Sequence, residues 1–225
     1  MLPYTLIRSK RKTLTLEITR EGELLARAPL RMPLAQVEAF LQEKEGWIRA
    51  KQGEIAARPR PPMRRYAEGE RFFFLGEELA LSYRQGLETP AREGKALLLP
   101  LARKAEAPQL VERWYRMQAR TVLQERVAYY LPRIPGSSCT GLRITGAKTR
   151  WGSCGAKNNL NFPYHLVMAP LACVDSVVVH ELCHTVRHDH SPAFWALVRR
   201  TLPDYEERHQ ILNNSRALFQ LGERE

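Results

Sequence analysis

Short runs of alternating apolar and polar residues dominate the first half of the chain, which is the pattern of strands with one buried face. Residues 13–19 and 23–29 predict the two strands of a hairpin, because a short turn separates them. Apolar residues at helical spacing then predict one helix from Pro33 to about Gln52. Three more strand-like runs follow, at residues 71–75, 78–84 and 96–101. This half therefore predicts a small mixed sheet that carries one helix.

The second half opens with a long helical pattern and continues with shorter elements. From Pro108 to Leu131 apolar residues recur on one face of a helix, and we expect that face to be buried; its members are Val111, Tyr115, Val122 and Tyr129. Short strands are predicted at residues 142–145, 148–154 and 159–162, and a helix from Pro170 through His184. The expected fold class is α+β, with a β-rich domain over residues 1–107 and a second α+β domain over residues 108–225.

A basic, proline-rich segment separates the helix of the first half from the later strands. It contains four arginines interleaved with prolines, which are Arg58, Arg60, Arg64 and Arg65. Because proline cannot continue a helix, we expect residues 58–65 to form an exposed linker. The whole chain carries a formal net charge of +11, spread over both halves. Such a field favours acidic substrates or nucleic acid as partners, although a diffuse surplus is more often a solvated surface.

Three observations bear on the compartment. The chain has no run of about 18 apolar residues, so we expect no membrane span. Its amino-terminal residues lack the apolar core and small-residue cleavage site of a signal peptide. The four cysteines form no C-x-x-C pair, which indicates reduced thiols in a reducing compartment. We therefore expect a cytoplasmic protein, and the sequence has no signature of its oligomeric state.

The segment His180-Glu181-Leu182-Cys183-His184 carries the candidate chemistry. Two histidines four residues apart project from the same side of a helix, so their nitrogens can converge on one Zn²⁺. Glu181 follows the first histidine directly and points to the side where an open coordination position would lie. There its carboxylate could accept a proton from a metal-activated water and pass it to a leaving amine. The motif therefore predicts a hydrolytic site with one Zn²⁺ per chain.

Two later histidines compete for the position of third ligand. In an unbroken helix the Cα of His188 would lie about 12 Å from that of His180, so His188 could not easily complete the site. Ser191 and Pro192 predict the start of a new helix, so the chain must turn before His190. That turn favours His190 over His188. An acidic third ligand from the next helix is the remaining alternative: Asp204, Glu206 or Glu207.

The spacing from His180 to His190 matches the metzincin pattern H-E-x-x-H-x-x-G-x-x-H. However, Arg187 occupies the glycine position, and every methionine precedes His180, so no Met-turn can follow. The sequence therefore excludes the metzincins.

Several segments around the motif are distinctive. They are KTRWGSC at residues 148–154, NLN at 159–161, VVVHELCH at 177–184 and HSPAFW at 190–195, with RSKRKTL at 8–14 and GWI at 46–48 near the amino terminus. Together they resemble the YgjP-like family of zinc metallopeptidases over nearly the whole chain. The resemblance implies a zincin-type domain, distantly related to SprT and WLM proteases. It also implies His180, His184 and His190 as zinc ligands and Glu181 as the catalytic base.

Peptide hydrolysis needs a group besides the metal to stabilise the oxyanion. We nominate His165 and Tyr205 as neutral donors, although a strand-end residue and a packing aromatic are the simpler interpretations. Arg150 could hold a substrate carboxylate or polarise the scissile carbonyl, and an exposed basic residue is the simpler interpretation.

Two functions therefore stay open. The leading hypothesis is a zinc metallopeptidase acting on a peptide or protein substrate, with Glu181 activating the water. The alternative is a basic nucleic-acid-associated protein with a structural zinc site, or a protease recruited to nucleic acid through residues 58–65. A structural site usually has four protein ligands, and only three are evident here, which favours the metallopeptidase.

Overall fold

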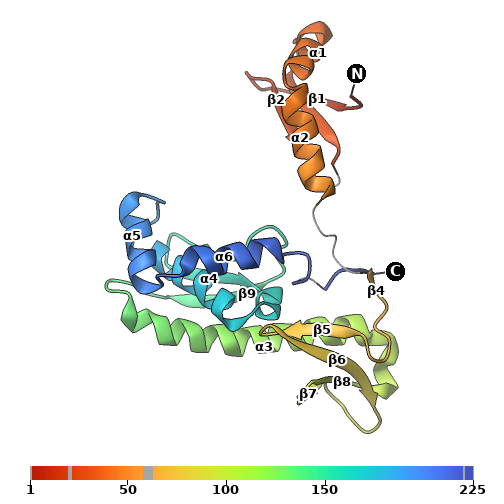
Figure 1. The fold of residues 1–225 in the computed structure, drawn as a ribbon, viewed down its shortest axis with the longest axis vertical. Coiled ribbons are helices and arrows are strands. Elements are labelled where there is room, and N and C mark those ends of the chain that lie inside the picture. Colours follow the sequence, from red (N-terminus) through yellow and green to blue (C-terminus); the bar gives the residue numbers. More distant parts are fainter. Residues whose placement is uncertain (1, 20–21, 58–62, 220, 225) are drawn as a thin grey trace. The chain divides into compact units, whose positions relative to one another are not determined.

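The computed structural model describes residues 2–19, 22–57, 63–219 and 221–224, and the chain divides into two compact units, Met1–Arg60 and Pro61–Glu225 (Figure 1). Both units combine helices with strands, which confirms the α+β class. The division differs from the one expected after residue 107. The reason is that the strands between residues 71 and 100 share one apolar core with the long helix that follows them.

The first unit is a three-stranded sheet with two helices. Its elements are β1 (Thr5–Ser9), β2 (Thr15–Ile18), β3 (Leu24–Pro29), α1 (Leu34–Glu43) and α2 (Glu45–Ala56). The predicted hairpin is confirmed as the antiparallel pair β2 and β3, and β1, which the pattern did not predict, pairs in parallel with β3. The prediction of a single helix is wrong, because the helix is interrupted at Lys44. The acidic Glu45 suits the amino-terminal end of the second helix. Side chains from β3 and both helices form a small core: Leu24, Ala26, Ala28, Val37, Leu41 and Ile48.

A four-stranded sheet of order β5-β6-β8-β7 opens the second unit. Its strands are β5 (Arg71–Phe74), β6 (Glu77–Arg84), β7 (Ala91–Glu93) and β8 (Ala96–Pro100). Strands β5, β6 and β8 confirm the three predicted runs, whereas β7 was not predicted. The central strands β6 and β8 pair in parallel, and the outer pairs are antiparallel. Inward-facing residues of this sheet share their core with α3 (Ala107–Tyr130), which two 3-10 turns flank at Leu101–Glu106 and Leu131–Arg133.

Helix α3 confirms the predicted helix except at its far end. Val111, Tyr115 and Val122 are buried as expected, whereas Tyr129 is 44% exposed. The neighbouring Tyr130 is buried instead, and its hydroxyl donates a hydrogen bond to Asp175 on the next long helix. The prediction for Tyr129 is wrong, because at this end of α3 the side that faces the helix of Asp175 carries Tyr130 and not Tyr129.

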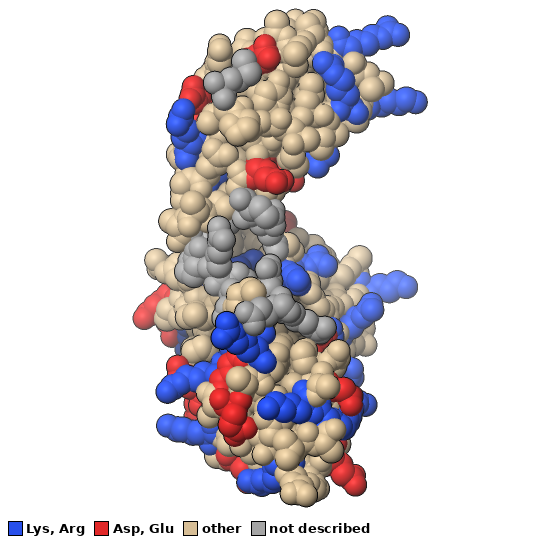
Figure 2. Space-filling model, turned by 90° about the vertical axis from the view of Figure 1, so that its right-hand side faces the viewer, with Lys and Arg blue, Asp and Glu red and all other residues tan. Residues whose placement is uncertain are grey.

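Arg64 is buried, whereas the sequence predicted that residues 58–65 form an exposed linker. Residues 58–62 of that segment lie outside the described residues. The short strand β4 (Met63–Arg64) pairs in parallel with β12 (Glu223–Arg224). The buried guanidinium of Arg64 donates to the carbonyl oxygens of Arg71 and Leu221 and lies over the ring of Phe72. On the face of the second unit in the lower part of Figure 2, basic and acidic side chains are interspersed. Through the two hydrogen bonds to carbonyl oxygens, Arg64 links β4 to Arg71 and Leu221, so this guanidinium is not presented to a partner.

A three-stranded sheet and three helices complete the second unit. The sheet consists of β9 (Gly141–Thr145), β10 (Ser153–Cys154) and the central β11 (Asn159–Pro163), with β9 parallel and β10 antiparallel to β11. A 3-10 turn at Tyr164–Met168 then leads into α4 (Leu171–His184), α5 (Pro192–Thr201) and α6 (Tyr205–Asn214).

The strand predicted from Lys148 is wrong over most of its length. Residues before Ser153 form bends, and only Ser153 and Cys154 pair in the sheet. The indole of Trp151 is buried, and its Nε1 donates to Oδ1 of Asn213 at 3.3 Å. The bends therefore let this segment reach α6 instead of continuing a flat edge strand.

Helix α4 lies at the centre of the second unit and contacts α3, α5 and α6. The guanidinium of Arg126 on α3 forms two hydrogen bonds to the carboxylate of Asp175 on α4, at 2.6 and 2.9 Å. Such a paired contact fixes α4 against α3 in one orientation. None of the helices within the described ranges is long and apolar enough to cross a membrane.

Candidate metal centre

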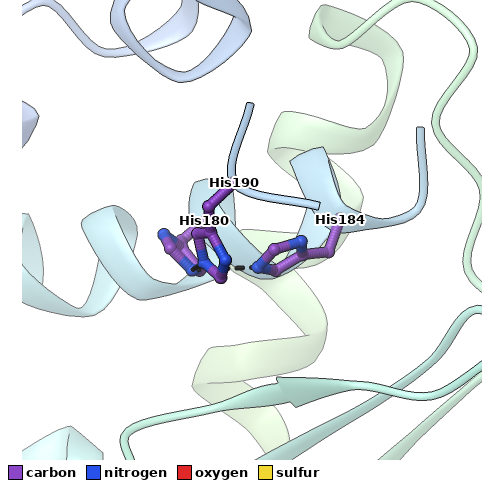
Figure 3. Close-up of side chains that lie close together, drawn as sticks. All are labelled: His180, His184 and His190. Atoms are coloured by element: carbon purple, nitrogen blue, oxygen red, sulfur yellow. Dashed lines mark hydrogen bonds between the residues drawn. The ribbon is translucent and has the colours of Figure 1, made fainter. Parts of the chain in front are cut away.

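Three histidines meet at the end of α4 and in the turn that follows it (Figure 3). The Nε2 atom of His180 lies 3.1 Å from Nε2 of His184 and 3.4 Å from Nε2 of His190. Among the described residues, these three form the one group of three or more His, Cys, Asp or Glu side chains whose donor atoms all lie within 4.8 Å of one another. His188 is exposed and is not part of the group. The structure thus brings together the three histidines predicted from the sequence.

The turn that brings His190 back toward α4 has the helix end and the helix start that the sequence predicts. Helix α4 ends at His184, and Ser191 caps α5 by accepting a hydrogen bond from the backbone N–H of Phe194. The hydroxyl of Ser191 also donates to the carboxylate of Asp189 at 2.8 Å. Pro192 occupies the first turn of α5, where the absence of an N–H carries no cost. The predicted break between the two helices is confirmed.

The rings of His180 and His184 are oriented by bonds at Nδ1. The Nδ1–H of His184 donates to the carbonyl oxygen of Arg187 at 3.0 Å, which leaves Nε2 as the atom with a lone pair. Nδ1 of His180 lies 2.9 Å from the hydroxyl oxygen of Tyr205. Bonds of this kind at the remote ring nitrogen set the tautomer and the direction of a metal-ligating histidine.

The nitrogen spacing fits a tetrahedral metal. Four ligands at about 2.0–2.1 Å from Zn²⁺ lie about 3.3–3.4 Å from one another. The two Nε2 distances from His180 are 3.1 and 3.4 Å. Three imidazoles are also ligands that Zn²⁺ accepts readily, and they leave a fourth position for water or substrate. The residues present therefore fit a mononuclear metal site.

Burial keeps the histidines of α4 neutral. It lowers the pKa of His180 to about 3, and the neighbouring histidines add to this effect. Burial also lowers the pKa of His184, whose ring stacks on Phe194 with centroids 4.4 Å apart. A neutral imidazole offers a lone pair to a cation, whereas a protonated one does not.

Glu181 points into the same region from a buried position. Burial raises the pKa of its carboxyl group to about 8, and the positive charge of Arg150 opposes that shift. A divalent cation held beside it would likewise oppose the shift. The side chain packs against the backbone of Gly152, where an added Cβ would lie 2.5 Å from Oε1 and 2.7 Å from Cγ of Glu181. The carboxylate can occupy this place only because residue 152 has no side chain.

The three residues nominated for secondary contacts have different positions. Arg150 is exposed and lies near enough for its charge to act on Glu181. His165 is buried with its ring against Trp151, and it is not among the residues that line the cavities beside His180. Tyr205 lies behind His180, on the Nδ1 side of the ring, so its hydroxyl faces away from the nitrogens that converge.

The alternative acidic ligands are engaged elsewhere or lie outside the group. The carboxylate of Glu206 pairs with Arg199 at 2.7 Å, and that of Asp204 pairs with Arg208 at 2.8 Å. Glu207 is exposed and is not part of the histidine group. His190 is thus the third donor that the geometry favours.

Two adjoining cavities flank His180 and share the side chains of His209 and Asn213. The larger, of about 600 Å³, extends over Trp195 and Arg199. The smaller, of about 240 Å³, is lined by Trp151, Gly152, Val177, His180, Glu181, His209, Asn213 and Arg216. The candidate base and one member of the histidine group therefore face one cavity that a substrate could enter.

His209 and Gly152 are functional candidates that the sequence reasoning missed. His209 lies four residues after Tyr205 on α6, so both share one face of that helix, and this spacing was the available signal. Gly152 had no comparable signal, because its importance depends on the approach of α4 to a bend far away in sequence.

No curated protein and no solved structure shows a significant match to the chain. A family model described as YgjP-like, metallopeptidase domain, matches residues 12–215. This range holds the three clustered histidines, Glu181, Gly152 and His209, and it covers most of the chain. The chain therefore belongs to the YgjP-like metallopeptidase family.

Proposed function

We propose that the chain is a zinc-dependent metallopeptidase in which His180, His184 and His190 hold the metal and Glu181 is the catalytic base. The observation that carries the proposal is the convergence of three imidazole nitrogens beside a buried carboxylate. Family membership supports peptide-bond hydrolysis as the reaction class and a peptide or protein as the substrate.

The zincin-type architecture is part of the same proposal. Helix α4 carries the first two histidines together with the candidate base, and the turn after it supplies the third histidine. The short strand β10 lies at the edge of its sheet and contacts α4. A helix bearing the metal ligands beside an edge strand supports a site for an extended peptide.

The mechanism assigns the proton transfers to one carboxylate. When bound, Zn²⁺ polarises a carbonyl group and lowers the pKa of a coordinated water toward 7. Glu181 takes a proton from the attacking water as the oxygen bonds to the scissile carbonyl carbon, and it then gives that proton to the leaving nitrogen as the C–N bond breaks. The absence of a side chain at Gly152 leaves the space that the carboxylate occupies in both transfers.

Arg150 is proposed to contact substrate from the rim of the site. Its exposed guanidinium is near enough to act electrostatically on Glu181, so it could hold a substrate carboxylate close to the reacting bond.

The proposal is tested with wild type, Glu181→Gln and the matched control His188→Ala. Zinc is measured by elemental analysis, and hydrolysis is measured on fluorescently labelled casein and on a broad peptide library. We expect all three proteins to bind zinc, with hydrolysis reduced about 10²–10⁴-fold in Glu181→Gln and unchanged in His188→Ala. A wild-type protein that holds a full complement of zinc but cleaves no substrate would contradict the proposal.

A further inference from the structure

His209 lies beside the histidine cluster and has no role in the function proposed above. Its ring stacks on that of Tyr205, with centroids 5.3 Å apart and an angle of 19°. The hydroxyl oxygen of Tyr205 lies 3.4 Å from Nδ1 of His209 and 2.9 Å from Nδ1 of His180. The two Nδ1 atoms are therefore at most 6.3 Å apart, which is the sum of these distances. His209 thus belongs to the immediate surroundings of the candidate ligand.

The positions of the hydrogens in the hydrogen-bonded series His180, Tyr205 and His209 can be assigned by elimination. If Nε2 of His180 binds a metal, its neutral ring carries the hydrogen on Nδ1, and that N–H donates to the oxygen of Tyr205. The hydroxyl hydrogen of Tyr205 is then available to donate to Nδ1 of His209. A neutral His209 whose Nδ1 accepts a hydrogen bond carries its own hydrogen on Nε2. The order of bonds therefore makes Nε2 of His209 a donor.

The surroundings of His209 supply the other conditions for such a donor. The side chain lines both cavities beside His180, and the smaller cavity is also lined by Glu181. Within the described part of the chain, its Nε2 has no hydrogen-bond partner. Burial and the charge of Arg216 lower the pKa of His209, which keeps the ring neutral. Asn213 lines the same cavities, and its Oδ1 accepts a hydrogen bond from the indole N–H of Trp151.

We infer that His209 is a catalytic hydrogen-bond donor, whose Nε2–H binds the carbonyl oxygen of the scissile peptide bond as negative charge develops there. The inference rests on the proposed peptidase function and adds to it the group that stabilises the oxyanion together with the metal. It replaces both nominated donors, because the hydroxyl of Tyr205 accepts from His180 and donates to His209, and His165 lies in the core.

A kinetic experiment compares wild type, His209→Ala, His209→Gln and the control Ile211→Ala. Ile211 is on the same helix and is 44% exposed, so its change tests for general damage to α6. With casein and a cleaved library peptide as substrates, we expect His209→Ala to lower kcat about 10²–10³-fold, with KM changed by less than about threefold. The amide N–H of glutamine can reach the position of Nε2, so His209→Gln should retain more kcat than His209→Ala. Zinc content should be equal in all four proteins.

A second measurement is independent of turnover. Imidazole ¹⁵N spectra of the zinc-loaded protein should show His209 with hydrogen on Nε2 and none on Nδ1, and Tyr205→Phe should alter the Nδ1 signal. A hydrogen on Nδ1, or a kcat of His209→Ala within about threefold of wild type, overturns the inference while the proposed function stands. Loss of zinc from His209→Ala would also overturn it, because the residue would then support the metal site. If wild type itself cleaves nothing, the proposed function has failed.

Discussion

The α-carbon of Gly152 lies so close to the side chain of Glu181 that a β-carbon at that position would come within 2.5 Å of Oε1. Glu181 is on α4, whereas Gly152 is in the bend before β10, so the contact joins two separate elements. Gly152 does not have the positive φ that would require glycine. The lack of a side chain at this position is therefore explained by the space that the carboxylate needs.

Gly152→Ala should displace the carboxylate while leaving the histidines in place. We expect hydrolysis to fall by about 10²-fold or more, within the range for loss of a positioned base, while zinc content stays unchanged. Overpacking should cost about 1–3 kcal/mol of unfolding free energy. Activity, zinc content and urea unfolding are measured beside Gly141→Ala, where an added Cβ meets nothing within 4 Å. A fully active Gly152→Ala protein would show that the carboxylate tolerates displacement.

Tyr205→Phe should weaken metal binding. It removes the hydroxyl that lies 2.9 Å from Nδ1 of His180, and loss of such a partner typically costs about 10–100-fold in metal affinity. Zinc affinity is measured by competition with a chelator, and Tyr129→Phe, which changes an exposed tyrosine, is the control. Equal affinities in the two variants would mean that Tyr205 does not orient the ligand.

Metal analysis should separate His190 from His188. We expect His190→Ala to lose zinc in the presence of a chelator, because a site with two imidazoles is left with half of the usual four ligands. His188→Ala should keep its zinc, since this exposed side chain is not part of the histidine group. The opposite pattern would assign the third ligand to His188.

His165 should make the stability of the protein depend on pH. Burial lowers its pKa from 6.5 to about 4, so between these values the unfolded chain binds a proton that the folded chain does not. The contribution of His165 to the unfolding free energy is therefore complete above pH 6.5 and decreases as the pH falls toward 4. Relative to His165→Phe, wild type should lose about 3 kcal/mol between pH 7 and pH 4 in urea unfolding. A difference that does not change with pH would contradict this assignment.

Local patterns predicted the parts of the site that lie close together in sequence. The four-residue spacing of His180 and His184 needs only one helix, and the turn before His190 follows from the capping preferences of Ser191 and Pro192. These features are decided within a few residues of one another, so they can be read without knowing the tertiary structure.

Contacts between distant elements could not be predicted in the same way. The hydroxyl of Tyr205 reaches His180 only because α6 packs against α4, and nothing in the local sequence fixes which side of the ring it meets. The segment before Ser153 has the alternation of a strand, yet burial of Trp151 against α6 bends it. The division of the structure differs from the expected one for a similar reason, because the strands at residues 71–100 pack on α3.

The pairing of β4 with β12 brings together two segments that lie about 160 positions apart, and Arg64 reinforces it through the carbonyl oxygen of Leu221. Within the described residues, the first and last strands of the unit that bears the histidines therefore lie side by side. Because adjacent ends permit circular permutation, residues 63 and 224 could be joined by a short linker and new ends opened in the turn at Gly86. Retained zinc binding in such a permuted protein would show that the order of elements along the chain is not needed to assemble the three imidazoles.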